Sequence, residues 1–205
     1  IVQQEAQSFH KSRPFTCSPD RSGLLVLDLQ RYFLDPGSHA FIPSAAAILP
    51  GIQALIAAYR RRNLPVLFTQ HVNTPQDAGM MASWWRDLIQ ADNPYVAIDP
   101  SLDVQPEESI RKTQYDAFFA TDLKDRLNQR GLTQLVICGV MTHLCVETTV
   151  RSAFMRGFEV FLPVDGSATY HHRFHLASML NLAHGFATLV AVRDILEKVV
   201  AGNAA

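Results

Sequence analysis

Six apolar runs, each followed by a stretch of helical spacing, set the pattern of this chain. Most runs are rich in Val, Ile, Leu and Phe, which is typical of strands that are buried on both faces of a sheet. The predicted strands are 23–30, 64–71, 109–114, 134–140, 158–164 and 186–190. The predicted helices are 44–62, 80–90, 121–130, 143–157, 173–184 and 192–200. This alternation predicts an α/β fold, a doubly wound six-stranded parallel sheet with helices on both faces, because parallel neighbours need crossover helices.

The length of the chain predicts one domain. Its 205 residues, 48% of them hydrophobic, are enough to bury a single substantial core. We expect this domain to cover residues 23–200. A polar segment with Pro14 and Pro19 precedes it, so residues 1–22 are predicted to form an amino-terminal arm with at most a short helix.

Charge and cysteine content narrow the function classes. The formal net charge is -1 and no basic or acidic block interrupts the chain, so neither nucleic acid nor a membrane is an expected partner. A small-molecule substrate is expected instead. The three cysteines are an odd number, which favours a reducing compartment. No apolar run reaches membrane-spanning length and the start lacks a signal pattern, so we expect a cytoplasmic protein.

Four polar residues lie at or just beyond the ends of predicted strands. Asp28 interrupts the first apolar run, and Gln70 is the penultimate residue of the strand 64–71. Lys112 lies near the end of the strand 109–114, and Cys145 follows the strand 134–140. The carboxyl ends of parallel strands meet at one edge of the sheet, where such folds bind their ligands. We therefore expect these side chains to converge on one crevice.

Cys145 is the candidate nucleophile. It falls in the predicted first turn of a helix, where unpaired backbone N–H groups and a partial positive charge favour a thiolate over a thiol. Asp28 is a candidate to take the thiol proton, and Lys112 to hold Asp28 ionised, which are the requirements of acyl transfer to cysteine. The simpler interpretations are a small buried hydrophobe for Cys145, a structural salt bridge for Asp28 and a solvated lysine for Lys112.

Three ordered blocks carry a family resemblance over residues 22–196. They are Leu27-Asp28-Leu29-Gln30 with Tyr32-Phe33, Lys112-Thr-Gln-Tyr-Asp-Ala-Phe-Phe119, and Cys138-Gly-Val-Met-Thr-His-Leu-Cys145 leading into 153–157. By these blocks the chain resembles the isochorismatase-like hydrolase superfamily. The resemblance implies an Asp28, Lys112 and Cys145 catalytic triad. It also implies a non-proline cis peptide between Val140 and Met141, with the backbone N–H groups of Met141 and Cys145 as oxyanion donors.

The resemblance favours the amidase branch, which is similar to nicotinamidases and N-carbamoylsarcosine amidases. Isochorismatases, which hydrolyse a vinyl ether, characteristically have glycine where this chain has Cys145, and their substrate-binding arginine has no clear equivalent between Gln70 and Trp84. Nicotinamidases bind a metal through an Asp-x-His motif, but here Thr69 stands before His71. We therefore expect a C–N hydrolase without metal or cofactor, and a homodimer or homotetramer as in the family.

The segment 72–106 is predicted to be a long irregular excursion that contributes to substrate binding. Phe33, Gln70 and Trp84 are expected in the pocket, although Phe33 and Trp84 also fit a core and Gln70 could simply satisfy backbone groups. A metal site at His171, His172 and His175 is disfavoured, since no acidic or thiolate partner is near in sequence. Isochorismate hydrolysis and noncatalytic ligand binding remain the alternatives to an amidase.

Overall fold

The computed structural model describes residues 15–201. A seven-stranded sheet forms the centre of the molecule. The strands are β1 (Ser22–Leu27), β2 (Val66–His71), β3 (Ser109–Lys112), β4 (Gln134–Val140), β5 (Glu159–Pro163), β6 (Ser167–Ala168) and β7 (Thr188–Val190). Their order is β3-β2-β1-β4-β5-β7, with β6 beside β4, and every pair is parallel. The six predicted strands are confirmed. The structure adds the two-residue β6, which has no apolar run to reveal it.

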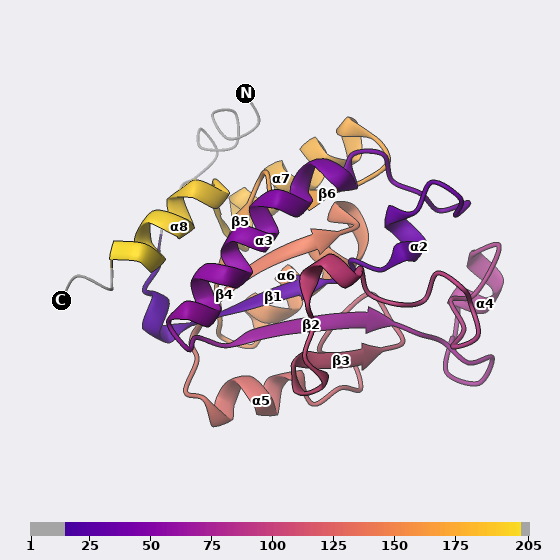
Figure 1. Cartoon of the computed structure of the whole chain (residues 1–205), viewed down its shortest axis with the longest axis horizontal. Coiled ribbons are helices and arrows are strands. Elements are labelled where there is room, and N and C mark those ends of the chain that lie inside the picture. Colours follow the sequence, from indigo (N-terminus) through magenta and orange to yellow (C-terminus); the bar gives the residue numbers. More distant parts are fainter. Residues whose placement is uncertain (1–14, 202–205) are drawn as a thin grey trace.

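Helices cover both faces of the sheet, as the alternation predicts (Figure 1). The α-helices are α2 (Arg31–Leu34), α3 (Ala45–Arg61), α4 (Met81–Trp84), α5 (Leu123–Gln129), α6 (Glu147–Met155), α7 (His172–Gly185) and α8 (Val192–Ala201). Shorter turns are η1 (Pro19–Arg21), η2 (Pro100–Leu102), η3 (Pro106–Glu108) and η4 (Thr142–Val146). None of the helices within residues 15–201 combines the length and apolar character that a bilayer crossing requires.

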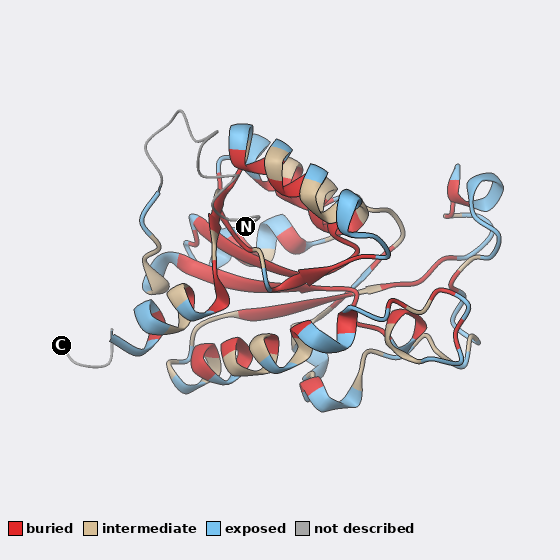
Figure 2. Ribbon diagram, turned by 90° about the horizontal axis from the view of Figure 1, so that it is seen from above, coloured by how far each residue is buried: buried red, intermediate tan, exposed pale blue. Residues whose placement is uncertain are grey.

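Two apolar cores lie on the two faces of the sheet (Figure 2). The strands alternate, so Leu24 and Val26 of β1 face the core under α3 and α8, whereas Leu25 and Leu27 face the core under α5, α6 and α7. β1 is buried along its whole length because it lies between β2 and β4. This double burial explains why the strand reads as a continuous apolar run.

A close approach of two strands occurs where β1 ends. Leu27 pairs with Gly139 of β4, and Gly139 has a φ of +119°. A Cβ at this position would lie 2.1 Å from the carbonyl oxygen of Leu27, so only glycine fits. Asp28 follows Leu27 directly after β1 ends, so the close approach of Leu27 and Gly139 places Asp28 near the end of β4.

The excursion between β2 and β3 contains less helix than expected. The prediction of a helix over 80–90 is wrong beyond Trp84, and the predicted loop after β1 contains the short helix α2. The backbone carbonyls of Ile89 and Tyr95 accept hydrogen bonds from Asn73 and Tyr32. These hydrogen bonds attach the segment after Trp84 to residues that follow β2 and β1, so this segment packs against the domain. The expected arm over 1–22 lies largely outside the described residues, and β1 begins at Ser22.

Candidate active site

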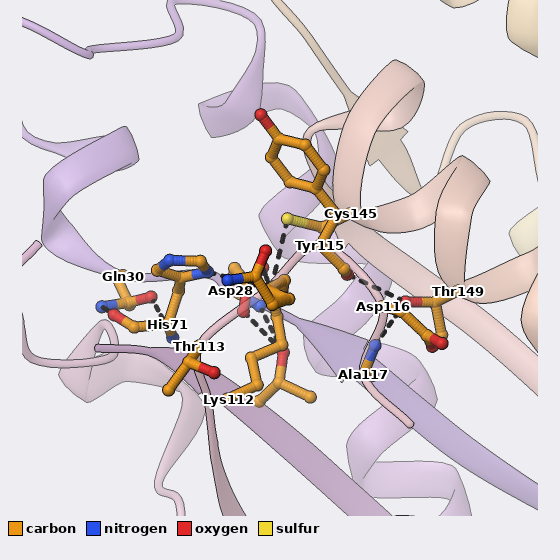
Figure 3. Close-up of polar contacts among 12 residues, drawn as sticks. Asp28, Gln30, His71, Lys112, Thr113, Tyr115, Asp116, Ala117, Cys145 and Thr149 are labelled. Carbon is orange, nitrogen blue, oxygen red and sulfur yellow. Dashed lines mark hydrogen bonds and ion pairs between the residues drawn. The ribbon is translucent and has the colours of Figure 1, made fainter. Parts of the chain in front are cut away.

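Four polar side chains converge where strands β1 to β4 end (Figure 3). Asp28 follows β1, His71 is the last residue of β2, Lys112 is the last residue of β3, and Cys145 lies in η4 after β4. In Figure 1 the strand arrowheads point toward the side that carries α2 and α4. The side chains of Asp28 and Lys112 are both 0% exposed, although each carries a charge. Burial of this kind requires that the charges be paired.

Asp28 is held in one orientation by its neighbours on β2 and β3. Its φ of 53° lies in the left-handed region, which aspartate tolerates better than most residues but which still stores strain. The backbone N–H of Asp28 donates to the carbonyl oxygen and to Oγ1 of Thr69, both at 3.2 Å. In turn, Thr69 Oγ1 donates to Asp28 Oδ1 at 2.6 Å. The other oxygen, Oδ2, faces Lys112 Nζ at 2.8 Å and has no further partner among the described residues.

Lys112 lies at the centre of the cluster. Besides Asp28, its Nζ is 2.9 Å from the carbonyl oxygen of Gln114, 3.2 Å from Nδ1 of His71 and 3.3 Å from Sγ of Cys145. An ammonium has three hydrogens, so these four acceptors share them. Lys112 therefore connects the carboxylate to the thiol.

Opposite charges keep the buried pair ionised. Burial alone would raise the pKa of Asp28, but the charge of Lys112 and the hydrogen bonds from Lys112 and Thr69 together hold that pKa below its usual range. Burial alone would lower the pKa of Lys112, but Asp28 and Cys145 outweigh it and raise that pKa. The site thus contains a stable carboxylate and a stable ammonium at neutral pH.

Cys145 is a thiol in the resting site. Burial, followed by the charge of Asp28, raises its pKa to about 12, although Lys112 acts in the opposite direction. Burial of Cys145 therefore opposes the thiolate that its position at a helix start was expected to favour. The main reason is burial, which disfavours an anion, and the ammonium of Lys112 only partly offsets it because Lys112 is already paired with Asp28.

The turn between β4 and α6 presents Cys145 to this cluster. The peptide bond between Val140 and Met141 is cis, at the position where the resemblance implies one. Beyond it, the carbonyl oxygen of Met141 accepts hydrogen bonds from the N–H groups of Leu144 and Val146. Residues 142–146 then form a π-helical turn instead of the predicted first turn of an α-helix. A turn of this kind is common at functional sites.

A cavity of about 200 Å³ opens above Cys145. Its walls are mostly apolar and aromatic, and they come from the segments after β1, β2, β3 and β4. The lining includes Tyr32, Phe33, Met81, Trp85, Leu88, Ile89, Tyr115, Met141, Leu144 and Tyr170. Its polar lining is His39, His71, Asn73, Arg86 and Asp87. A cavity with this lining fits a small ligand that carries few charges.

The structure brings only one of the three expected pocket residues to this cavity. Phe33 lines it. Gln70 does not, because successive strand residues face opposite sides: it lines a separate hollow, and its Nε2 donates to the carbonyl oxygen of Val96 at 2.9 Å. Trp84 is 75% exposed, whereas the neighbouring Trp85 lines the cavity and donates from Nε1 to the hydroxyl of Tyr115 at 2.7 Å. The structure therefore does not place Gln70 or Trp84 in the lining of this cavity.

His71 and Thr69 are site residues that the sequence interpretation missed. Both belong to β2, on the face opposite to Gln70. His71 is held by Gln30, whose Oε1 accepts from the His71 N–H at 2.8 Å and whose Nε2 donates to the His71 carbonyl oxygen at 3.1 Å. The sequence could have indicated both residues. They lie at the end of a predicted strand, as Asp28 does, and the alternation of strand residues places Thr69 and His71 on the same face.

A metal ion has one geometrically possible location among residues 15–201. Donor atoms of Asp28, His71 and Cys145 lie within 4.8 Å of one another. However, Nζ of Lys112 lies among these three atoms at 2.8, 3.2 and 3.3 Å, so an ammonium already takes the place of a cation. The residues present do not fit a resident metal while Lys112 is charged. The three histidines of 171–175 do not form such a cluster either.

Comparison with known proteins identifies relatives of this chain. An isochorismatase-domain family model matches residues 22–194. Nicotinamidase 3 of Arabidopsis thaliana is 37% identical over 187 residues, which are 89% of this chain and 90% of that protein. The fold resembles that of a cysteine hydrolase from Pseudomonas syringae pv. phaseolicola 1448A, with a TM-score of 0.87 and 23% identity over 93% of this chain and 99% of that chain. It also resembles the N-carbamoylsarcosine amidase from Thermoplasma acidophilum, with a TM-score of 0.74 and 20% identity over 84% and 96% of the two chains.

The family follows from the extent of these matches. The family model covers most of the described chain, and the Arabidopsis relative is similar over nearly its whole length. The chain belongs to the isochorismatase family and is a hydrolase.

Proposed function

We propose that this protein is a metal-independent cysteine hydrolase that cleaves the C–N bond of a small, uncharged amide or carbamoyl compound. The observation that carries the proposal is the position of Lys112 Nζ, 2.8 Å from Asp28 Oδ2 and 3.3 Å from Sγ of Cys145, a residue that lines an apolar cavity. The three side chains provide a base, a charge partner for that base and a nucleophile.

The chemistry proceeds in two halves. As the substrate carbonyl approaches, Asp28 accepts the thiol proton and Sγ of Cys145 bonds to the carbonyl carbon. The backbone N–H groups of Met141 and Cys145 stabilise the oxyanion that develops. Collapse of this intermediate breaks the C–N bond, and the proton on Asp28 leaves with the amine or ammonia. Asp28 then takes a proton from water, whose oxygen attacks the thioester and releases the carboxylic acid and the free thiol.

The lining of the cavity favours an uncharged substrate over isochorismate. Isochorismate carries two carboxylates, which need cationic partners. Lys112 is already paired with Asp28, and the one arginine of the lining, Arg86, has an 81% exposed side chain that lies 3.5 Å from Asp87. A planar amide needs no such partner. Because a nicotinamidase is among the relatives, nicotinamide is the first substrate to test.

The decisive experiment measures ammonia release across nicotinamide, other small amides and carbamoyl compounds, with mass spectrometry of the Cys145 peptide for a trapped acyl adduct. We expect turnover by the unmodified protein, none by Cys145→Ala, and normal turnover by Cys17→Ser as the matched control. Full activity of Cys145→Ala on the substrate found would overturn the proposal. Release of pyruvate from isochorismate, undiminished in Cys145→Ala, would favour vinyl ether hydrolysis instead. An absence of turnover with every substrate would favour a ligand-binding role.

Metal independence has its own test. Because the ammonium of Lys112 lies among the three potential metal ligands, dialysis against EDTA is expected to leave the amidase rate unchanged. A loss of rate that added Zn²⁺ or Fe²⁺ restores would contradict this part of the proposal.

Assembly as a homodimer or homotetramer remains a prediction. Exposed apolar residues such as Met155 and Phe119, which are 73% and 54% exposed, are compatible with contacts between copies. Size-exclusion chromatography with light scattering tests it, and a monomer at micromolar concentration would contradict it.

A further inference from the structure

His71 is a buried titratable residue that the proposed mechanism does not use. It is 6% exposed and lines the cavity beside Cys145. Its two ring nitrogens have different partners: Nδ1 lies 3.2 Å from Lys112 Nζ, and Nε2 lies 2.7 Å from Oδ1 of Asn73. The backbone of His71 is fixed by Gln30, so the ring has little freedom to leave these contacts.

The hydrogen-bond partners determine the tautomer of the ring. Lys112 can only donate, so Nδ1 of His71 must accept and the ring hydrogen must be on Nε2. That hydrogen then points at an oxygen of Asn73. The orientation of the Asn73 amide is fixed independently, because its Nδ2 donates to the carbonyl oxygen of Thr113 at 2.9 Å. The network is therefore consistent only with the neutral Nε2–H form.

The charges around His71 favour the same state. The groups that face it are the ammonium of Lys112 from β3, the carboxylate of Asp28 after β1 and the thiol of Cys145 from η4. Asp77, which follows β2, is engaged by Arg111 at 2.7 Å. Burial, and then the charge of Lys112, lower the pKa of His71 to about 4. A second cation here would have to share the single carboxylate that Lys112 already occupies.

We propose that His71 is a positioning residue that, as the neutral Nε2–H tautomer set by Asn73, holds the Lys112 ammonium between Asp28 and Cys145. The consequence for turnover rests on the proposed function, whereas the tautomer and its effect on the thiol do not. His71 supplies one of the four acceptors of Lys112 and, like Cys145, it lines the cavity. Without it the ammonium is free to move away from the sulfur.

The ring state is measured directly. Two-bond ¹H–¹⁵N spectra of the full chain between pH 8 and pH 5, compared with spectra of His71→Asn, identify the His71 signals among those of the eight histidines. We expect one protonated ring nitrogen, Nε2, and no titration over this range. A charged ring, or a proton on Nδ1, would overturn the proposal.

Asn73→Asp tests whether the amide sets the neutral state. A carboxylate opposite Nε2–H stabilises the imidazolium, so the pKa of His71 is expected to rise. Below that raised pKa the ring is charged and cannot accept from Lys112, so kcat of the variant falls as the pH falls, by about tenfold or more. Above it the ring is neutral and kcat recovers. A loss that is the same at every pH would indicate a merely structural role and contradict the proposal.

Two substitutions of His71 separate the acceptor from the size of the ring. In His71→Asn the amide oxygen is able to replace Nδ1, whereas His71→Leu offers no acceptor. The probe is iodoacetamide, with the rate of Cys145 labelling read by peptide mass spectrometry, because this reaction needs no substrate. Lys112 favours the thiolate, so labelling of His71→Leu is expected to be about tenfold slower than that of the unmodified protein, and labelling of His71→Asn within about threefold.

The outcomes keep the two proposals apart. Equal labelling rates in His71→Asn and His71→Leu would overturn the positioning role. If the unmodified protein turns over no amide, the proposed hydrolase function fails, but the spectra and the labelling rates still decide the role of His71. Circular dichroism and thermal unfolding of each variant show whether a slow rate reflects loss of the fold.

Discussion

The floor and the mouth of the cavity differ in almost every physical property. The floor is defined as Cys145, which lines the cavity, together with Asp28 and Lys112, which do not. All three are buried at or beyond strand ends, and Lys112 contacts the other two. The mouth contains His39 and Asp87, whose side chains are 43% and 50% exposed and lie 3.5 Å apart. The floor is held by the sheet, whereas the mouth is held by loops that pack on one another.

This difference separates chemistry from selectivity. Buried charges on rigid strands interact strongly, because little water screens them and their geometry costs no reorganisation. Exposed charges on loops are screened and contribute little energy. We therefore expect substitutions at the floor to change kcat and the stability of the fold, and substitutions at the mouth to change mainly KM.

The largest expected effect is that of Lys112→Met, which leaves Asp28 as an unpaired buried charge. We expect loss of turnover and a decrease in the free energy of unfolding of about 3–5 kcal/mol at pH 8. The pKa of Asp28 then rises above its unfolded value, so the variant loses stability as pH rises from about 4. Urea unfolding at pH 5 and pH 8 measures both effects. Arg111→Met, one residue earlier on β3 and 51% exposed, is the control and is expected to cost less than about 1 kcal/mol.

Thr69→Val is expected to have a smaller effect at the floor. It removes the hydroxyl that donates to Asp28 Oδ1 at 2.6 Å, so kcat/KM is expected to fall by about 10- to 100-fold. Because this hydrogen bond holds the pKa of Asp28 low, the acid limb of the pH profile is expected to move to higher pH. Thr133→Val, at an exposed position before β4, provides the control. An acid limb that does not move would show that Thr69 does not tune the base.

At the mouth, two adjacent tryptophans provide a matched pair. Trp85 lines the cavity, so Trp85→Ala is expected to raise KM by about 3- to 10-fold with little change in kcat, because it removes uniform binding. Trp84 is 75% exposed and outside the cavity, so Trp84→Ala is expected to change neither. Steady-state kinetics of both variants, on the substrate that the amide screen identifies, measure these changes in KM and kcat. A larger effect in Trp84→Ala would reverse the placement of the two side chains.

The smallest expected effect is that of pH on the unmodified protein. The pKa of Asp28 is lowered, the pKa of Lys112 is raised, and the pKa values of His71 and Cys145 are about 4 and about 12. No group of the floor therefore titrates between pH 6 and pH 9, and kcat/KM is expected to vary by less than about twofold there. Stability from Asp28 is lost only as pH falls through its lowered pKa, and stability from Lys112 only as pH rises through its raised pKa. A bell-shaped profile centred near pH 7 would contradict this assignment of charges.

The sequence placed two side chains one residue away from the cavity lining, for a different reason in each case. Gln70 and Trp84 were expected in the pocket, whereas the residues that line the cavity are their neighbours His71 and Trp85. On a strand, a shift of one residue moves a side chain to the opposite face. In the excursion after β2, no period exists to assign a face at all. Asp28 and Lys112 were placed correctly, because a charged residue in or beside an apolar run is recognisable without knowing which face of the strand it occupies.

The amino-acid sequence by itself determined the α/β sheet, the positions of its six main strands and the convergence of Asp28, Lys112 and Cys145, because apolar periodicity and strand ends are local features. Only the tertiary structure decided which neighbours line the cavity, that His71 contacts Lys112, and that Cys145 rests as a thiol. Those properties depend on burial and on distances between segments that lie far apart along the chain, and no local pattern encodes them.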